Sequence, residues 1–520
     1  MRIALLIIFL IFSLPGLFAQ GLVTMQPFSI ATGNLEPDGR RDALQISPNE
    51  FVTLAKTKGG TFGPSEYALE KFDFNLKSQF KVLINVGEEE DPKEIYFNGK
   101  EIVVFTVVHE NAKKTSKLLA YGFSSVDGSK QWDKVLDEFK VNEFAAVKFK
   151  GAVRESFENC VSSCVTKNYV TPFNYQYEIK FSPDNKKVLT YIYDYSQRNL
   201  VANVKLFDKE LNQLESDMIP IDNNFTSYGL YPNNKGDVFI LNADRLGRIV
   251  LIQYNLPSKS NKLLDLQYTS ANREGLVLKL LNDNVAYVAS VCTKDKKLLG
   301  ILYAKFDFKQ NVIDKINYHE ISDAMRQTVS LMRNSMKSLP GDETWRNFHI
   351  TDFHVNEYEK IVLVMEKREI VAMGYDNSQA SDVNEPEKWK EKTARVNVEG
   401  LLLFSWNKDD ELLWENVYLK SQMTDVTSGL LSSSYSMHIT DEGKIRLVYP
   451  SANSAAGIMN TINYLEYDEL TGNKVKEIQL QNDEGLSMLR SYTLWTEDKI
   501  VVAGRKGLLG KKSFIGLYKF

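Results

Sequence analysis

Residue types that perform acid-base or metal chemistry are scarce in this sequence of 520 residues. It contains five histidines: His109, His319, His349, His354 and His438. His349 and His354 are the nearest pair, five positions apart in a strand-like segment. On a straight strand they would point to opposite faces, so they are not expected to share a metal ion.

The three cysteines, Cys160, Cys164 and Cys292, are too few for a disulfide scaffold. In an oxidising compartment, Cys160 and Cys164 either close a small disulfide loop or remain thiols. Two thiols lack the four ligands of a typical zinc site. Cys292 follows a strand-like apolar run, which predicts a buried position.

Motifs that would carry other chemistry are absent from the sequence. There is no Gly-x-Ser-x-Gly nucleophile turn, no phosphate-binding loop and no calcium loop. Acidic pairs such as Asp409-Asp410 are typical of solvated turns, whereas a carboxylate pair assembled from distant segments, as in glycosidases, remains an open alternative. The sequence therefore predicts no catalytic residue, no bound cofactor and no metal ligand.

The composition excludes other classes of protein. Hydrophobic residues make up 43% of the chain and charged residues 25%, which supplies a large core and argues against disorder. The 63 basic and 67 acidic residues give a net charge of -4. This balance lacks the basic stripe of a nucleic-acid-binding protein, so no nucleic-acid partner is predicted.

Residues 1–19 have the order of a secretory signal peptide. Arg2 precedes an apolar run from Ala4 to Leu14, and Ala19 provides a small residue for cleavage. The run is too short to span a bilayer, and no later stretch is apolar enough to do so. The mature protein is therefore expected to be secreted, periplasmic or at the cell surface, with no transmembrane segment after cleavage.

In the mature chain, apolar and polar residues alternate, which predicts an all-β fold. The clearest repeat runs from Tyr177 to Tyr193 and has a Pro-Asp-Asn turn between two strands. Looser copies bring the number of such turns to eight. Aromatic residues that close a third strand give the same count: Phe74, Phe123, Phe207, Tyr254, Phe308, Trp406, Tyr467 and Phe520. Repeated four-stranded meanders are typical of β-propellers, so residues 20–520 are predicted to form a single eight-bladed propeller domain, with seven blades as the alternative.

The spacing of these aromatic residues is about fifty, except in two longer intervals. The excess predicts insertions at about 139–172, 320–345 and 376–392. The first of these contains Cys160 and Cys164. Because functional residues concentrate on loops held by a rigid scaffold, the insertions are candidates for binding specificity.

The last repeat ends at Phe520 with only three strands, while the stretch from Leu22 to Ile30 is β-prone. Pairing this stretch with the last repeat would supply a fourth strand and close the ring. Pro27 favours an edge position, because proline lacks the amide hydrogen of a ladder bond. The alternative is an unpaired leader segment.

One amphipathic helix is predicted in the second insertion, because apolar residues recur at helical spacing from Ile321 onward. The helix either packs over the propeller rim or docks a partner. In the second case Met325, Arg326, Met332 and Arg333 are the candidate contact residues, with methionine giving an adaptable surface and arginine favouring an acidic partner.

Two short segments resemble known propeller families. Residues 181–188, Phe-Ser-Pro-Asp-Asn-Lys-Lys-Val, look like the core of the WD40-like repeats in secreted bacterial propellers, with Asn185 in place of glycine. Residues 127–132 are similar to the turn of quinoprotein-type blades, and Trp132 and Trp414 resemble the tryptophans of those blades. The resemblance implies a WD40-like or quinoprotein-like β-propeller.

The sequence thus favours a secreted, non-catalytic propeller that binds a protein or glycan partner, or serves as a scaffold, in the periplasm or at the cell surface. The alternative is a propeller hydrolase or lyase that acts on extracellular glycan or peptide. Charged residues clustered at one mouth of the central channel would favour the enzyme. An exposed apolar or aromatic rim would favour the binding protein.

Overall fold

The computed structural model describes residues 22–28, 42–58, 64–87, 90–110, 113–140, 177–194, 200–244, 247–267, 272–295, 297–335, 345–372, 394–425, 434–453, 459–480, 486–506 and 512–519. The predicted signal peptide (1–19), Cys160, Cys164 and the insertion at 376–392 lie outside the described residues. The insertion at 139–172 lies outside them from residue 141 onward.

The described strands form eight four-stranded antiparallel sheets, numbered here as blades 1 to 8 in chain order. Blade 1 contains β2 (Ala43–Ser47), β3 (Glu50–Lys58), β4 (Ser65–Asp73) and β5 (Ser78–Val86). Blade 2 contains β6 (Glu90–Phe97), β7 (Glu101–Glu110), β8 (Thr115–Ser124) and β9 (Lys130–Lys140). Blade 3 contains β10 (Glu178–Phe181), β11 (Lys187–Asp194), β12 (Leu200–Asp208) and β13 (Gln213–Ile221). Blade 4 contains β14 (Phe225–Pro232), β15 (Val238–Asp244), β16 (Ile249–Asn255) and β17 (Ser260–Leu266).

Blade 5 contains β18 (Asn272–Leu280), β19 (Val285–Lys294), β20 (Lys297–Asp307) and β21 (Val312–Glu320). Blade 6 contains β22 (Phe348–Val355), β23 (Ile361–Ala372), β24 (Ala394–Trp406) and β25 (Leu412–Asp425). Blade 7 contains β26 (Ser436–Ile439), β27 (Lys444–Asn453), β28 (Met459–Asp468) and β29 (Lys474–Leu480). Blade 8 contains β30 (Leu486–Trp495), β31 (Lys499–Lys506), β32 (Lys512–Lys519) and β1 (Leu22–Phe28). Helix α4 (Asp323–Ser335) lies between blades 5 and 6 in the chain.

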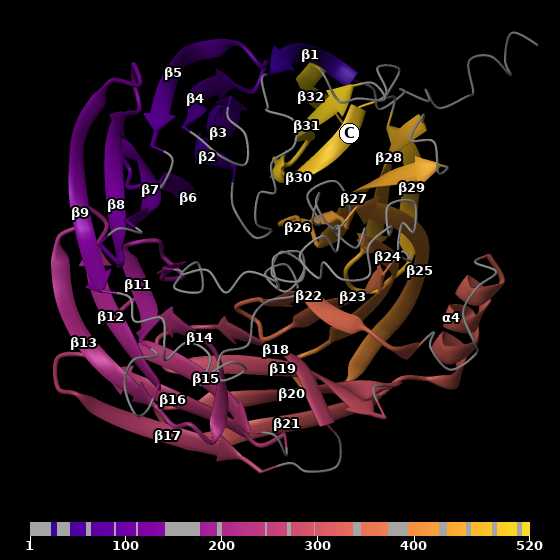
Figure 1. The fold of residues 1–520 in the computed structure, drawn as a ribbon. Helices are drawn as coiled ribbons and strands as arrows, with labels where there is room; N and C mark the ends of the chain where they lie inside the picture. The colour runs from indigo at the N-terminus through magenta and orange to yellow at the C-terminus, as the bar shows by residue number, and fades with distance from the viewer. Residues whose placement is uncertain are drawn as a thin grey trace, which may run out of the picture.

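The eight sheets stand in a ring as the blades of a propeller (Figure 1). Fourth strands such as β9, β13 and β17 lie at the periphery, and first strands lie toward the centre. Hydrophobic clusters fill the spaces between blades, as between β23 and β24 of blade 6 and β27 and β28 of blade 7. The predicted all-β class and the count of eight blades are confirmed, and the alternative of seven blades is wrong.

The repeat signals in the sequence correspond to fixed strand positions. Each of the eight turns joins the first strand of a blade to its second strand. The closing aromatic residues that the structure describes lie at or next to the ends of third strands, and all of them are buried. Phe308 of blade 5, for example, is fully buried and meets Phe239 of blade 4 edge-on, with ring centroids 5.3 Å apart. Burial between neighbours therefore stabilises sheets too small to form a core alone.

The N-terminal strand closes the ring, as predicted. β1 pairs antiparallel with β32, with Leu22 opposite Tyr518 and Phe28 opposite Ser513. β1 is the outermost strand of blade 8. Pro27 thus lies in an edge strand, where a residue without an amide hydrogen is tolerated.

The two faces of the ring differ in their connections. Turns between first and second strands, and between third and fourth strands, lie on one face, which we call the turn face. Connections between second and third strands, and from one blade to the next, start and end at the opposite face, which we call the loop face. All three predicted insertions follow strands that end at the loop face, namely β9, β21 and β23.

Hydrogen bonds between successive blades fix the turn face. The amide of Asp184 donates to Oδ1 of Asn234, and the amide of Asn234 donates to Oδ1 of Asp283, each at 3.0 Å. Tyr96 of blade 2 donates its hydroxyl to the carbonyl of Asn185 at 2.7 Å. The turns of blades 2 to 5 are thus joined in a continuous chain.

Trp414 of β25 joins the turn faces of blades 6 and 7. Its Nε1 donates to the carbonyl of Glu469 at 2.9 Å. The indole lies against Gly472, which has a φ of +68°, and a Cβ at position 472 would lie 2.5 Å from the ring. Glycine is required here both for the left-handed backbone and for the close approach.

Gly472→Ala is expected to lower the free energy of unfolding by about 2–4 kcal/mol, since it combines backbone strain with overpacking. Gly99→Ala is the matched control, because Gly99 also has a positive φ of +96° but a Cβ at position 99 would meet nothing within 4 Å. That control should cost about 1 kcal/mol. Urea unfolding measures both values, and equal losses would contradict a constraint by Trp414.

Candidate functional site

Helix α4 begins at the loop face and packs on the outside of the ring near β25 (Figure 1). Ile321, Met325 and Val329 are buried in the hydrophobic cluster shared by blades 5 and 6. Asp323 and Ala324 are exposed on the opposite side of the first turn. The predicted amphipathic helix is present, and its apolar stripe faces the propeller.

The four residues predicted for partner docking all lie on α4. Met325 is 3% exposed. Arg326 donates to two main-chain carbonyls, one in β20 and one just after β21, and its guanidinium lies 5.4 Å from the ring centroid of Trp345. The side chains of Met332 and Arg333 lie outside the described part of the structure. In the described structure, Met325 and Arg326 hold the helix to the ring.

A carboxylate anchors the start of α4. Glu415 of β25 is hydrogen-bonded to Nε2 of His319 at 3.1 Å and to the hydroxyl of Ser322. Ser322 also caps the helix, because its Oγ accepts from the amide of Met325 at 3.1 Å. Burial alone would raise the pKa of Glu415, but His319 and Ser322 hold it below its usual value. These bonds fix the orientation of the helix on blade 6.

The first strand of blade 6 and the start of blade 7 bring together a polar group near the ring centre. Tyr435 donates its hydroxyl to Oδ2 of Asp352 at 2.5 Å. Oδ1 of Asp352 lies 3.6 Å from Nε2 of His354, whose side chain is 44% exposed. Burial raises the pKa of Tyr435 well above its usual value, so it remains a donor at neutral pH. The group combines an oriented carboxylate with a solvent-accessible imidazole.

The strand that carries this group is not straight. β22 contains a bulge between Ile350 and Asp352, which reverses the alternation of side chains. Ile350 and Val355, also five positions apart, both pack in the cluster shared with blade 5. By the same spacing, His349 and His354 lie on one face of the strand. The expectation that they point to opposite faces is wrong, because it assumed a regular strand.

An ionic network is buried between blades 6 and 7. Glu366 accepts from Nε of Arg368 at 2.7 Å and from Oγ of Ser434 at 2.6 Å, and its Oε1 lies 2.6 Å from Nζ of Lys420. Burial alone would raise the pKa of Glu366, but Lys420 and Arg368 hold it below its usual value. The side chains of Glu366, Arg368 and Lys420 are at most 3% exposed. The network is therefore a structural link rather than a surface for ligands.

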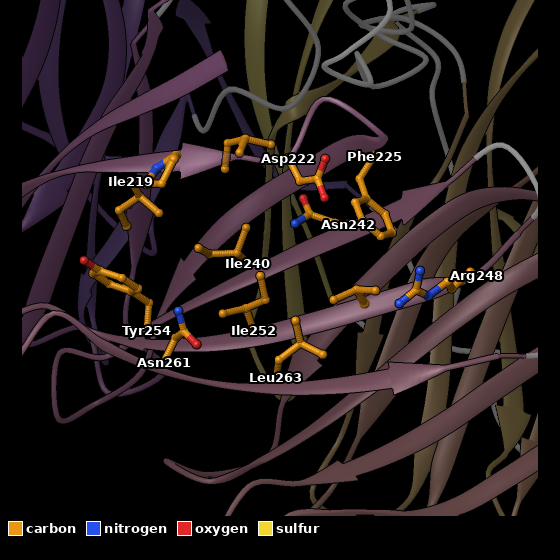
Figure 2. Close-up of a pocket in the computed structure, with 13 residues that line it drawn as sticks. Ile219, Asp222, Phe225, Ile240, Asn242, Arg248, Ile252, Tyr254, Asn261 and Leu263 are labelled. Carbon is orange, nitrogen blue, oxygen red and sulfur yellow. The ribbon is translucent and has the colours of Figure 1, made fainter. Parts of the chain in front are cut away.

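A cavity of about 290 Å³ lies between blades 3 and 4, and we call it the seam cavity (Figure 2). Its wall is largely apolar and includes Ile219 of β13, Ile240 of β15, Ile252 of β16 and Leu263 of β17. At one end Tyr254 donates its hydroxyl to an aspartate of β13 at 2.6 Å. The volume lies just below the range of pockets for drug-sized ligands, so a smaller group fits.

Polar side chains gather at the other end of the seam cavity, near the loop face. Arg248 donates to both carboxylate oxygens of Asp265, at 2.9 and 2.5 Å, and lies 5.4 Å from the ring centroid of Phe225. Arg248 lowers the pKa of Asp265, so the pair stays ionised. Asp222 is exposed and, like Asn242, lines the cavity (Figure 2).

Asn242 is the unusual residue of the seam cavity. It is 3% exposed, and its Oδ1 has no hydrogen-bond partner among the described residues. An unsatisfied buried acceptor costs about 1–3 kcal/mol. Such a group in a native structure needs an explanation, and a ligand that supplies a donor is one.

Cys292 is fully buried in β19, which confirms its predicted position. In the described ranges, no three His, Cys, Asp or Glu side chains gather closely enough to hold a metal ion. Among the same residues, none of the helical segments has the length and apolar character needed to span a bilayer.

Sequence reasoning did not single out Asn242, Glu366 or Tyr435. Asn242 follows the apolar run Val238–Leu241 inside a strand. A polar residue directly after such a run is the sequence feature that could have identified it as a buried polar group. Glu366 ends a similar run but begins the charged series Glu-Lys-Arg-Glu, which is typical of an exposed strand end.

Eight four-stranded sheets in a closed ring define the protein as an eight-bladed β-propeller. No protein-family model and no curated protein matches the chain. The WD40 domain of SCAP from fission yeast is a similar solved structure, with a TM-score of 0.40 and 10% identity over 96% of this chain and 98% of that one. The β-propeller domain of the Trilobed protease from Pyrococcus furiosus has a TM-score of 0.36 and 10% identity, over 80% of this chain and 91% of that one. Porphyromonas gingivalis dipeptidyl peptidase 4 has a TM-score of 0.39 and 9% identity, over 92% of this chain and 67% of that one. With TM-scores of 0.40 or less, these similarities support no conclusion about this chain.

Proposed function

We propose that the protein is a secreted, non-catalytic β-propeller that binds a protein partner through its loop face, in the periplasm or at the cell surface. The observation that carries the proposal is the position of the three insertions, 139–172, 320–345 and 376–392, which all follow strands ending at this face. Binding residues concentrate on loops held by a rigid scaffold. The assignment to the cell exterior is supported by the signal-peptide pattern of residues 1–19.

The turn face is less suited to a partner. Its polar groups already form hydrogen bonds between blades. Asp184, Asn234 and Asp283 are hydrogen-bonded to one another across blades 3 to 5. Lys360 likewise donates to the carbonyl of Glu469 across blades 6 and 7 at 2.8 Å. A partner bound there would have to compete with these bonds. The loop face carries the longer connections and is the face we assign to binding.

A hydrolase or lyase acting on extracellular glycan or peptide is the second candidate function. The observation that favours it is the group formed by Asp352, His354 and Tyr435. An imidazole that lies 3.6 Å from a carboxylate and is open to solvent is suited to general-base chemistry. The innermost strand of a blade is also a position that a substrate in the channel would reach.

The test uses the mature protein as bait in an envelope fraction, with two altered forms. In the loop-face form, Gly/Ser linkers replace residues 141–176 and 373–393; a linker of about ten residues crosses the width of a blade. The turn-face form is Tyr358→Ser, at a side chain that is 73% exposed. Wild type and Tyr358→Ser should recover the same protein, and the loop-face form should lose it while keeping its urea midpoint.

Two results would overturn the proposal. The first is recovery of the same partner by the loop-face form together with its loss in Tyr358→Ser, which would assign binding to the turn face. The second is cleavage of a glycan or peptide library by the purified protein, abolished in His354→Ala. That outcome would establish the enzyme instead.

A further inference from the structure

The seam cavity joins an apolar wall to the buried side chain of Asn242, whose Oδ1 has no hydrogen-bond partner among the described residues. We infer that it accepts an aliphatic side chain from a peptide segment of the partner, with the main-chain amide of that peptide hydrogen-bonded to Asn242. The inference rests on the proposed function, because it assigns one contact of the partner.

The wall of the cavity fits an aliphatic group. Ile219 comes from the outermost strand of blade 3, whereas Ile240, Ile252 and Leu263 come from three strands of blade 4. Figure 2 shows these side chains around a common space. A side chain placed there would bury its surface between two blades, as the core residues of the ring do.

The side-chain amide of Asn242 favours a ligand that has a hydrogen-bonding group next to its aliphatic side chain. Its Oδ1 needs a donor, and its side-chain nitrogen offers two donors of its own. A peptide group supplies one N–H donor and one carbonyl acceptor a few ångströms from the side chain it carries. A fatty acid offers the aliphatic part but has no donor at neutral pH.

The charges at the mouth of the cavity also disfavour a carboxylate. Arg248 is held in a two-pronged pair by Asp265, and the described carboxylates of Asp244 and Asp222 also act on it. Among the described residues, carboxylates outnumber guanidinium groups at this end by three to one. The N–H of a peptide is favoured there, and an anionic head group is repelled.

The position of the cavity links it to the proposed binding face. Asp222 lies in the connection from blade 3 to blade 4, and Arg248 lies in the connection from β15 to β16. Both connections belong to the loop face. A partner bound over this face would therefore be able to insert a peptide segment into the cavity.

The experiment is a methyl NMR titration of the mature protein with isoleucine labelling. The probes are acetyl-leucine methylamide, acetyl-serine methylamide, which has the same amides without an aliphatic side chain, and hexanoate, which has an aliphatic chain without an amide. The leucine probe should shift the methyl signals of Ile219, Ile240 and Ile252. The serine probe and hexanoate should bind at least tenfold more weakly. Hexanoate binding as tightly as the leucine probe would overturn the inference, as would unshifted signals.

Asn242→Leu separates a ligand role from a structural role. If Asn242 serves a ligand, this variant should bind the leucine probe about three- to tenfold more weakly, while its urea midpoint stays equal or rises. A lower midpoint with unchanged binding would overturn the inference. Because the probe is titrated without any partner, this result is independent of the loop-face pull-down, and each can fail alone.

Discussion

Deletion of residues 20–30 is expected to lower the free energy of unfolding of a chain that spans residues 20–520 by about 3–6 kcal/mol. β1 pairs with β32 at six positions from Leu22 to Phe28, and each lost ladder bond costs about 0.5–1.5 kcal/mol. The deletion would also leave β32 as an open edge, which favours association of chains. The urea midpoint and the elution volume in size-exclusion chromatography measure the two effects.

A synthetic peptide with the sequence of residues 20–30 provides the control. Added in excess, it should restore the urea midpoint of the truncated chain, because it can occupy the vacant edge of β32. A scrambled peptide of the same composition should not. If truncation leaves the midpoint unchanged, or if both peptides restore it equally, pairing between β1 and β32 does not close the ring.

Much of this fold could be predicted because propeller blades have local rules. The alternation of apolar and polar residues specifies strands, and turns such as Pro183-Asp184-Asn185 specify hairpins. The closing aromatic residues mark the third strands, since each must fill the space against a neighbouring blade. Closure of the ring could also be predicted, because the last repeat has only three strands and the stretch from Leu22 to Ile30 is β-prone.

The candidate sites could not be predicted in the same way, because they depend on contacts between blades. Ser434 and Lys420 meet Glu366 from positions more than fifty residues away, and nothing in the local sequence of Glu366 specifies them. No sequence feature predicts the bulge in β22, which places His354 on the same face of the strand as His349. Asn242 is unusual because the described residues around it supply no donor for its Oδ1, which depends on how the blades pack.

Glu366→Gln is expected to lower the free energy of unfolding by about 3–5 kcal/mol, because it leaves the buried cations Arg368 and Lys420 without a countercharge. Glu210→Gln is the matched control, since Glu210 pairs with Lys209 at 3.4 Å and both side chains are about half exposed. The control should leave the urea midpoint unchanged. A combined replacement of Glu366, Arg368 and Lys420 by apolar residues should recover most of the loss. Equal midpoints for Glu366→Gln and Glu210→Gln would contradict the buried network.

The effect of Glu366→Gln should also depend on pH, in a direction fixed by the pKa of Glu366. Lys420 and Arg368 hold this pKa below the unfolded value of about 4.3, so between the two values the unfolded chain binds more protons than the folded chain. The stabilisation by Glu366 is therefore fully present above about pH 4.3 and is lost as the pH falls through the folded pKa. The difference in stability between wild type and Glu366→Gln should then be constant from pH 6 to 8 and narrow below about pH 4. Urea unfolding across this range measures the difference, and a gap that widens in acid would show that Glu366 is protonated in the folded protein at neutral pH.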